Sequence, residues 1–327
     1  MKKKDLLITP SLYSLFLYLL INEDWTNSDY ALSSRIPLVI HERLRILFGV
    51  NVYSSTVGTK GNVLSKIIKK NLDYFKYQRY SRKYKYERVW GNDEFVLSMK
   101  YRYQGIRLIE DGPYNSFDEH FFVKRRFKQE GILLPYWFYW IFKNYIPYGF
   151  NDNVKQIYHT SAITLNPKIA RKGIEVNLRK SWDTLSPKRK SDILYLFGIK
   201  DELLKKINEY STVCVTQVLP IPEEDKIELY RNLLRGVDES EVLIKTHYAE
   251  TTDYKRYFPK ASVISLPIPM QLFDLLGYSP KKILTISSSA ITPFIKDGVE
   301  IIFLGTECDK RISDVYGIIR LEHILNK

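Results

Sequence analysis

Short apolar runs alternate with helix-like stretches along this chain, and this alternation limits its fold more than any other feature. The pattern is clearest in the second half, where helix-like stretches cover residues 223–235 and 270–276. Strands that alternate with helices are typical of a parallel sheet with crossover helices. We therefore predict an α/β fold, with strands in the second half at 212–217, 242–246, 261–264, 283–286 and 299–304.

The first half repeats the alternation less regularly. We predict strands at 5–8, 36–40 and 106–109 and a basic amphipathic helix over 60–79. Residues 95–99 fit a helix or a strand equally well. The first half therefore carries the same α/β pattern, with one element of undecided type.

A polar, Lys/Arg-rich passage from 165 to 207 separates the two halves. A chain of 327 residues is typical of about two domains. We therefore predict two Rossmann-like, doubly wound domains, 1–206 and 207–327, that face one another across a central cleft.

The amino-terminal stretch imitates a signal peptide, because a basic start precedes an apolar run. The run from Leu12 to Ile21 is roughly half as long as a membrane span, and Thr9 and Pro10 break the stretch before it. We predict a strand, a Pro turn and a helix capped by Thr9 or Ser11. No transmembrane helix is expected anywhere in the chain.

The formal net charge of +13 predicts a surface that attracts an anionic partner. Nucleic acid, an anionic membrane and a phosphorylated substrate all meet this condition. Residues 76–88 interleave basic and aromatic side chains in a way that suits nucleic acid, but a solvated basic face explains them equally well. Residues 130–152 are rich in Trp and Tyr, which favour membrane interfaces, with packing between domains as the alternative.

Two adjacent acids follow the predicted strand at 106–109. Glu110 and Asp111 repel one another, and such repulsion can hold one of them partly protonated and ready to act as a base. Gly112 permits a turn directly after them. The alternative is a plain Asp-Gly-Pro turn without a catalytic role.

Three predicted strands of the second half also end in polar residues. Lys245 and His247 could hold an anion or transfer a proton, or could be a solvated Lys and a loop His. The serines at 287–289 could seat a phosphate at a helix start, or simply cap that helix. With Thr216 at the third strand end, and because ligands bind outside the carboxyl ends of such strands, we predict a phosphate site here.

Some well-known site motifs are absent from the sequence. It contains no G-x-G-x-x-G, no G-x-x-x-x-G-K-[ST] and no H-E-x-x-H, so the nicotinamide, P-loop and zincin classes lack support. It also contains no Asp-x-Asp pair. Single-domain glycosyltransferases that clamp a nucleotide sugar through a metal typically need such a pair, whereas a metal-free transferase with two domains does not.

Taken together, these motifs resemble those of the bacterial sialyltransferases of glycosyltransferase family 52. The resemblance covers most of the chain and is firmest after Thr212. It rests on the order of seven short motifs: Ile8-Thr9-Pro10, Trp90-Gly91-Asn92-Asp93, Glu110-Asp111-Gly112, Thr216-Gln217, Lys245-Thr246-His247-Tyr248, Pro267-Ile268-Pro269 and Ser287-Ser288-Ser289-Ala290.

The resemblance implies a GT-B fold, a CMP-sialic acid donor bound mostly by the carboxyl-terminal domain, and inversion at the anomeric carbon without an obligatory metal or other cofactor. It implies Asp111 as the base, with Glu110 second, and His247 as acid or as donor to the phosphate. The donor would contact Lys245, Thr216, Gln217, Ser287, Ser288, Ser289, Pro267 and Pro269. The acceptor side would involve Thr9, Pro10, Asn92 and Asp93.

Thr246 and Tyr248 replace the two prolines that flank the family's histidine, and this keeps a different nucleotide sugar open as the donor. In such a family, the acceptor is a terminal sugar of lipooligosaccharide, O-antigen or capsule, assembled on a lipid carrier. We therefore expect a cytoplasmic enzyme, peripheral on the inner face of the bacterial plasma membrane. Only Cys214 and Cys308 are present, which fits a reducing compartment. A homodimer stays open, and nucleic-acid binding is the remote alternative.

Overall fold

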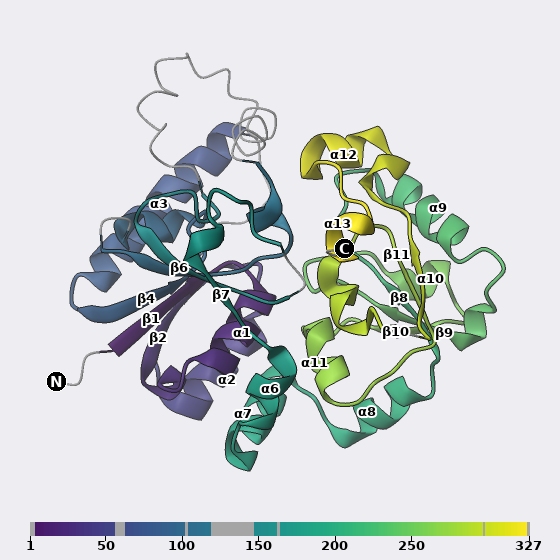
Figure 1. The fold of residues 1–327 in the computed structure, drawn as a ribbon, viewed down its shortest axis with the longest axis horizontal. Coiled ribbons are helices and arrows are strands. Elements are labelled where there is room, and N and C mark those ends of the chain that lie inside the picture. The colour runs from purple at the N-terminus through teal and green to yellow at the C-terminus, as the bar shows by residue number, and fades with distance from the viewer. Residues whose placement is uncertain are drawn as a thin grey trace. The chain divides into compact units, whose positions relative to one another are not determined.

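In the computed structural model, the described residues are 4–55, 63–101, 104–118, 147–161, 164–296 and 298–325. The chain divides into two compact units, Met1–Leu196 and Phe197–Lys327, each built around one parallel sheet (Figure 1). The sequence placed this boundary at 206/207. The second unit instead begins earlier and includes α8 (Asp201–Asn208).

The first unit contains a seven-stranded sheet in the order β3-β2-β1-β4-β5-β6-β7, in which every pair is parallel. Its strands are β1 (Lys4–Thr9), β2 (Ser28–Leu32), β3 (Val52–Ser54), β4 (Tyr86–Gly91), β5 (Ile106–Ile109), β6 (Val154–His159) and β7 (Gly173–Glu175). Its described α-helices are α1 (Leu12–Ile21), α2 (Leu38–Phe48), α3 (Val63–Ser81), α6 (Leu178–Asp183) and α7 (Pro187–Phe197).

The strand order of this sheet reverses at β1. The chain adds β2 and β3 on one side of β1 and then returns to place β4 on the other side. The helix α3 and the 3-10 helix η2 (Val96–Tyr101) cover one face, where Tyr77 and Leu97 pack against Leu6 and Ile8, and α1 and α2 lie on the opposite face (Figure 1). The carboxyl ends of β1 and β4 therefore flank a topological switch point, where open α/β sheets bind ligands.

The strand predicted at 36–40 is wrong, because these residues lead into α2. Pro37 precedes its first turn, and Gly49 ends it in the left-handed conformation. Ile40 and Leu44, four residues apart, are buried on one face of the helix. The true second strand, β2 (Ser28–Leu32), is fully buried, but its sequence SDYAL carries too few apolar residues to reveal it.

The second unit contains a five-stranded parallel sheet in the order β10-β9-β8-β11-β12. Its switch point lies between β8 and β11, and all its strands match predicted ones. They are β8 (Thr212–Val215), β9 (Val242–Lys245), β10 (Ser262–Ile264), β11 (Lys282–Thr285) and β12 (Glu300–Phe303). The other α-helices are α9 (Glu223–Leu233), α10 (Tyr254–Tyr257), α11 (Met270–Leu275), α12 (Lys310–Tyr316) and α13 (Glu322–Leu325).

One face of this second sheet is covered by α9, α10 and α12, whose Tyr230, Tyr254 and Ile312 pack on Cys214 and Ile244 of the strands. Figure 1 shows α11 on the other face. The predicted helix over 60–79 is confirmed for residues 63–79, which lie in α3. For residues 95–99, the helical alternative is the correct one, because residues 96–99 lie in the 3-10 helix η2.

Within the described ranges, no helix is both long enough and apolar enough to span a bilayer. The aromatic segment predicted at 130–152 falls largely outside those ranges, which resume at residue 147.

Candidate active site

Polar side chains join three strand ends at the switch point of the first sheet. Thr9 Oγ1 donates to Asn92 Oδ1 at 2.6 Å, and Asn92 Nδ2 donates to the backbone oxygen of Ile109 at 2.9 Å. Gly91 allows this approach, because its φ is 124° and a Cβ there would lie 1.8 Å from the oxygen of Ile8. Thr9 and Asn92, two of the predicted acceptor-side residues, are thus brought together, and both are buried.

Asp93 and Pro10, the other two predicted acceptor-side residues, take no part in the hydrogen bonds between Thr9, Asn92 and Ile109. Asp93 accepts from the amides of Tyr148 and Gly149 at 2.7 and 3.1 Å. Burial raises the pKa of Asp93 to about 6, although these two amide bonds lower it. Pro10 precedes Ser11, which caps α1 by accepting from the Ser14 amide.

Glu110 is fully enclosed directly after β5, with an exposed fraction of 1%. Its carboxylate accepts from Tyr13 Oη at 2.5 Å, from the Thr160 amide at 2.7 Å and from Thr160 Oγ1 at 2.8 Å. Burial raises the pKa of Glu110 to about 7, and the negative charge of Asp111 adds a smaller increase. The sequence identified neither Tyr13 nor Thr160 as part of this cluster.

Asp111 is only half-buried, in contrast to its neighbour. It forms a bridge to Pro113 across a turn in which Gly112 has a φ of 67°. The glycine therefore has the role that the sequence predicted, since an L side chain is strained in this conformation. Of the two adjacent acids, Asp111 is the one that a substrate hydroxyl could reach.

In the second sheet, a reciprocal pair of hydrogen bonds spans the switch point. Gln217 Nε2 donates to Ser287 Oγ at 2.6 Å, and the Ser287 amide donates to Gln217 Oε1 at 3.1 Å. Gln217 follows β8 and Ser287 follows β11. Gln217 and Ser287, two of the eight predicted donor-binding residues, are thus held together by the oxygen and the nitrogen of the Gln217 amide.

The remaining serines begin the 3-10 helix η6 (Ser289–Phe294). Ser288 caps it by accepting from the Ala290 amide at 3.3 Å, and the Ser288 amide itself donates to Thr285 Oγ1. Because these amides and that of Ser287 already have acceptors, the hydroxyl groups are the better candidates for phosphate contacts.

Lys245 acts as a brace at the end of β9. Its ammonium donates to the backbone oxygens of Thr246 and Leu266 at 2.8 and 3.1 Å, and burial lowers its pKa to about 8. The bond to Leu266 ties β9 to the turn that contains Pro267 and Pro269, the latter directly before α11. Lys245 therefore orders the predicted donor-binding turn and is turned toward it.

His247 is half-buried just beyond β9, and its position is fixed by several bonds. Its amide donates to Thr216 Oγ1 at 3.2 Å, and its Nδ1 accepts from the Ala249 amide at 3.2 Å. Its ring stacks on that of Tyr248, with 4.4 Å between centroids. Because Nδ1 acts as an acceptor, we infer that the neutral imidazole carries its proton on Nε2.

Glu250 is a further member of this cluster that the sequence did not identify. Its side chain is 2% exposed and pairs with Lys226, with 3.5 Å between Nζ and Oε1. The sequence instead drew attention to the acids at 223–225, which open α9. The sequence does contain one indication of the role of Glu250, because this acid lies three residues after His247 and can therefore share a turn with it.

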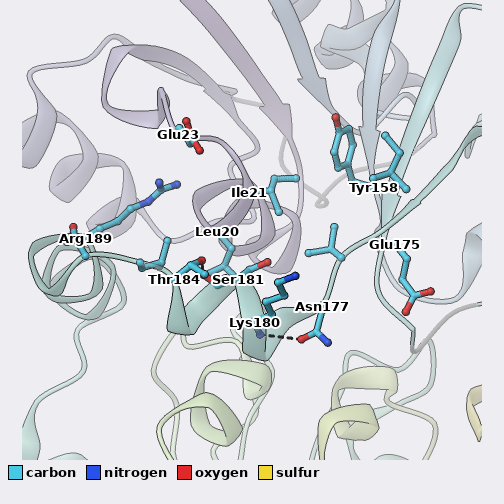
Figure 2. A pocket seen from close by; sticks show the side chains of 14 residues that line it. Leu20, Ile21, Glu23, Tyr158, Glu175, Asn177, Lys180, Ser181, Thr184 and Arg189 are labelled. Atoms are coloured by element: carbon cyan, nitrogen blue, oxygen red, sulfur yellow. Dashed lines mark hydrogen bonds between the residues drawn. The ribbon is translucent and has the colours of Figure 1, made fainter.

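A pocket of about 690 Å³ lies in the first unit, between the end of α1, β6, β7, α6 and α7 (Figure 2). Its lining includes Tyr158, Asn177, Lys180 and Arg189, and no residue that the sequence predicted for the site. Arg189 donates to the backbone oxygens of Leu19 and Asn22 near the end of α1. This pocket is therefore separate from the strand-end cluster around Glu110.

Two doubly wound parallel sheets, each with a polar cluster at its switch point, define a two-domain α/β protein of the kind that binds nucleotides. The family description "Glycosyltransferase family 52" matches residues 49–307, and the chain belongs to this family. The family and the glycosyltransferase class that the sequence indicated are thereby confirmed.

Two known proteins are similar to this chain along most of its length. An uncharacterized protein of Haemophilus influenzae is 28% identical over 318 residues, which cover 94% of this chain and 96% of that protein. The crystal structure of a Photobacterium 2,6-sialyltransferase, in complex with CMP and lactose, has a TM-score of 0.52 and 12% identity, and the match covers 92% of this chain and 71% of that one. The predicted GT-B class of two Rossmann-like domains is confirmed.

Proposed function

We propose that this glycosyltransferase is an inverting sialyltransferase, which moves sialic acid from CMP-sialic acid to a terminal sugar of a bacterial surface glycan without an obligatory metal. The observation that carries the proposal is His247, which lies beside the second switch point with its Nδ1 occupied as an acceptor. Family membership and the similarity in fold to a sialyltransferase that binds CMP add support.

The proposed reaction is a single displacement. The acceptor oxygen forms a bond to the anomeric carbon while the bond from that carbon to the CMP phosphate breaks, and CMP leaves with the electron pair. His247 donates from Nε2 to the departing phosphate, and the hydroxyls of Ser288 and Ser289 stabilise its negative charge. The acceptor proton passes to Asp111.

Asp111 is a better base than Glu110 because a substrate can reach it. The Glu110 carboxylate is enclosed and already accepts three hydrogen bonds from Tyr13 and Thr160, so a substrate hydroxyl cannot approach it. A pKa of about 7 would by itself suit a base, so enclosure is what excludes Glu110 from this role. We assign Glu110 to the positioning of the Asp111 turn.

A different nucleotide sugar is the second candidate donor. Tyr248 stands where the family pattern has a proline, and its ring covers one side of the imidazole. A donor with another base or sugar would bind to the same strand ends but meet this ring. The turn around Pro267 and Pro269 would contact the nucleoside in either case.

The acceptor side of the proposal rests on charge. A net charge of +13 favours contact with anionic lipid, and we propose a lipid-linked acceptor at the inner face of the plasma membrane. The nucleic-acid alternative loses support, because Tyr77, Tyr80, Tyr84 and Tyr86 of the basic run contact one another's rings.

Release of CMP from CMP-sialic acid in the presence of EDTA tests this function. We expect slow release by the protein, and loss of about 10²-fold or more in His247→Ala, the typical effect of removing a proton donor. Asn208→Ala, an exposed residue at the end of α8, is the control and should match the parent protein. Binding of another nucleotide sugar, seen as a raised melting temperature without any effect of CMP-sialic acid, would favour the second donor.

A further inference from the structure

The carboxylate of Glu250 gathers groups from four elements of the second unit. Oε2 accepts from Thr216 Oγ1, just after β8, and from the His247 amide at 3.1 Å, just after β9. Oε1 accepts from Tyr254 Oη in α10 at 2.8 Å and lies 3.5 Å from Lys226 Nζ in α9. Both oxygens are thus engaged, and none of these contacts is with solvent.

The loop that carries His247 is closed at both ends by the same residue. The Glu250 amide donates to the backbone oxygen of His247 at 3.0 Å, and the Glu250 carboxylate accepts from the His247 amide. Between them, the Ala249 amide donates to His247 Nδ1. The orientation of the imidazole therefore depends on a turn of four residues whose closing bonds both come from Glu250.

Thr216 has a defined place in this arrangement. Its single hydroxyl proton is donated to Glu250, and its oxygen accepts from the His247 amide. The hydroxyl is buried with the residue. A role in orienting His247 therefore accounts for Thr216 better than the direct donor contact that the sequence predicted.

Lys226 compensates the buried negative charge. Lys226 is itself buried, with an exposed fraction of 8%, and its ammonium also donates to Thr252 Oγ1. A carboxylate enclosed without a cation or proton would be strongly destabilised. The ion pair keeps Glu250 an acceptor on both oxygens, which the bonds to His247 and Thr216 require.

We infer that Glu250 is a positioning residue, which fixes the backbone of His247 and so aims the Nε2 proton of the imidazole. This inference rests on the proposed function of His247 but not on the identity of the donor. Glu250 does not touch the substrate itself, and its effect is expected in the turnover number more than in binding.

Glu250→Gln tests the inference, because the side chain keeps its size but loses one acceptor. Each oxygen of Glu250 faces one hydroxyl, which can rotate to accept, and one donor that cannot accept. The new amide nitrogen must therefore oppose either the His247 amide at Oε2 or the Lys226 ammonium at Oε1. We expect kcat for CMP release to fall about 100-fold, the scale of a displacement near 1 Å, while KM changes by less than about threefold. Glu202→Gln, exposed on α8, is the matched control and should retain the parent kcat.

The ¹⁵N signals of the His247 imidazole supply a readout that a purely structural role would not move. They can be assigned by their absence in His247→Ala and recorded in the free protein. We expect them to report protonation at Nε2 in the parent protein and a mixture of tautomers in Glu250→Gln. If Glu250→Gln does not fold, Thr216→Val removes only the bridging hydroxyl and should lower kcat about tenfold, with the same change in the signals.

Unchanged imidazole signals in a folded Glu250→Gln protein would overturn the inference, even if its melting temperature and activity fell. Failure of the parent protein to release CMP from CMP-sialic acid would instead count against the proposed donor. The signals of the free protein would still decide the role of Glu250 in that case.

Discussion

Glu110 in the first unit and Glu250 in the second occupy comparable places. Each lies beyond the carboxyl end of a strand in a doubly wound parallel sheet, and each accepts from one Thr and one Tyr hydroxyl. They differ in what compensates their charge. Glu250 is paired with the ammonium of Lys226, whereas no Lys or Arg among the described residues is bonded to Glu110.

This difference shows two ways to enclose a carboxylate at a strand end. Without a cation, burial favours the protonated form, and the pKa of Glu110 rises to about 7. With a cation, the charge can be kept and both oxygens remain acceptors. In the first arrangement, Glu110 carries less than a full negative charge near neutral pH and therefore repels the adjacent Asp111 less. In the second, the Glu250 carboxylate is a fixed acceptor for the His247 amide.

The largest expected effect separates the two adjacent acids of the first unit. Asp111→Asn removes the proposed base, and we expect the rate of CMP release to fall by about 10² to 10⁴, the usual contribution of a general base. Glu110→Gln should lower it by less than about tenfold, because Glu110 acts only on the position of the turn. Asp201→Asn, exposed on α8, is the control. The reverse order of the two losses would make Glu110 the base.

A stability measurement tests the ion pair of the second unit. Lys226→Met leaves the buried Glu250 without its cation, and breaking such a pair costs about 3 kcal/mol of unfolding free energy. Urea unfolding at pH 7 measures this loss, with the exposed Lys206→Met on α8 as the control. In the double variant with Glu250→Gln the loss should be smaller than the sum of the single losses. Additive losses would mean that the two side chains do not interact.

Glu110→Gln should behave in the opposite way and stabilise the protein at neutral pH. The folded state holds the Glu110 proton more tightly than the unfolded chain does, since the pKa rises from 4.5 to about 7. Stability is therefore fully present below pH 4.5 and is lost as the pH rises through 7. At about 1.4 kcal/mol for each tenfold change in proton affinity, the loss amounts to about 3 kcal/mol.

Glutamine resembles the protonated acid in having no charge. The Glu110→Gln protein therefore does not lose unfolding free energy as the pH rises. Its oxygen can accept from the Thr160 amide, while its nitrogen donates to the hydroxyls of Tyr13 and Thr160, which are free to rotate. Urea unfolding from pH 4.5 to 8 should show a variant that gains on the parent protein as the pH rises. A parallel pair of curves would show that Glu110 does not titrate in this range.

The sequence identified the second sheet well, because its strands are short apolar runs between helices with clear periodicity. In the first sheet it identified only β1 and β5, and it took the start of α2 for a strand. The clearest cases are β2, a fully buried SDYAL that carries polar residues, and α2, where an apolar PLVI begins a helix. Burial of β2 depends on its neighbours β1 and β3, and a pattern read along one chain does not contain that information.

The candidate site was predictable to the level of strand ends. Motifs placed Thr216, Gln217, His247 and the serines just after three strands, and the structure has them at the carboxyl ends of β8, β9 and β11. The direction of each side chain was not predictable: Lys245 was expected to face an anion, but it donates to two backbone oxygens. Glu250 was missed because an acid in a polar loop shows its burial only once α9 and α10 enclose it.

The smallest expected effect concerns what happens to stability when a buried acid of the first unit is replaced by its amide. It tests whether this change depends on hydroxyl donors that can rotate, and not on burial alone. Asp93 is also buried, and its pKa rises from 3.8 to about 6, so the parent protein loses stability as the pH rises through 6. Asp93→Asn removes this loss. However, the donors to Asp93 are the amides of Tyr148 and Gly149, which cannot turn to accept from the new nitrogen.

One donor–donor contact therefore replaces a hydrogen bond in Asp93→Asn, at a cost of about 1 to 3 kcal/mol. This cost nearly offsets the gain from removing the buried charge, and we expect a net change below about 1 kcal/mol in urea unfolding at pH 7.5. Below pH 4, where the parent carboxyl is protonated and its hydroxyl can be placed away from the amides, the variant should be the less stable of the two. A gain at pH 7.5 as large as that of Glu110→Gln would show that burial alone governs both carboxylates, and that the hydroxyl donors around Glu110 have no part in its response.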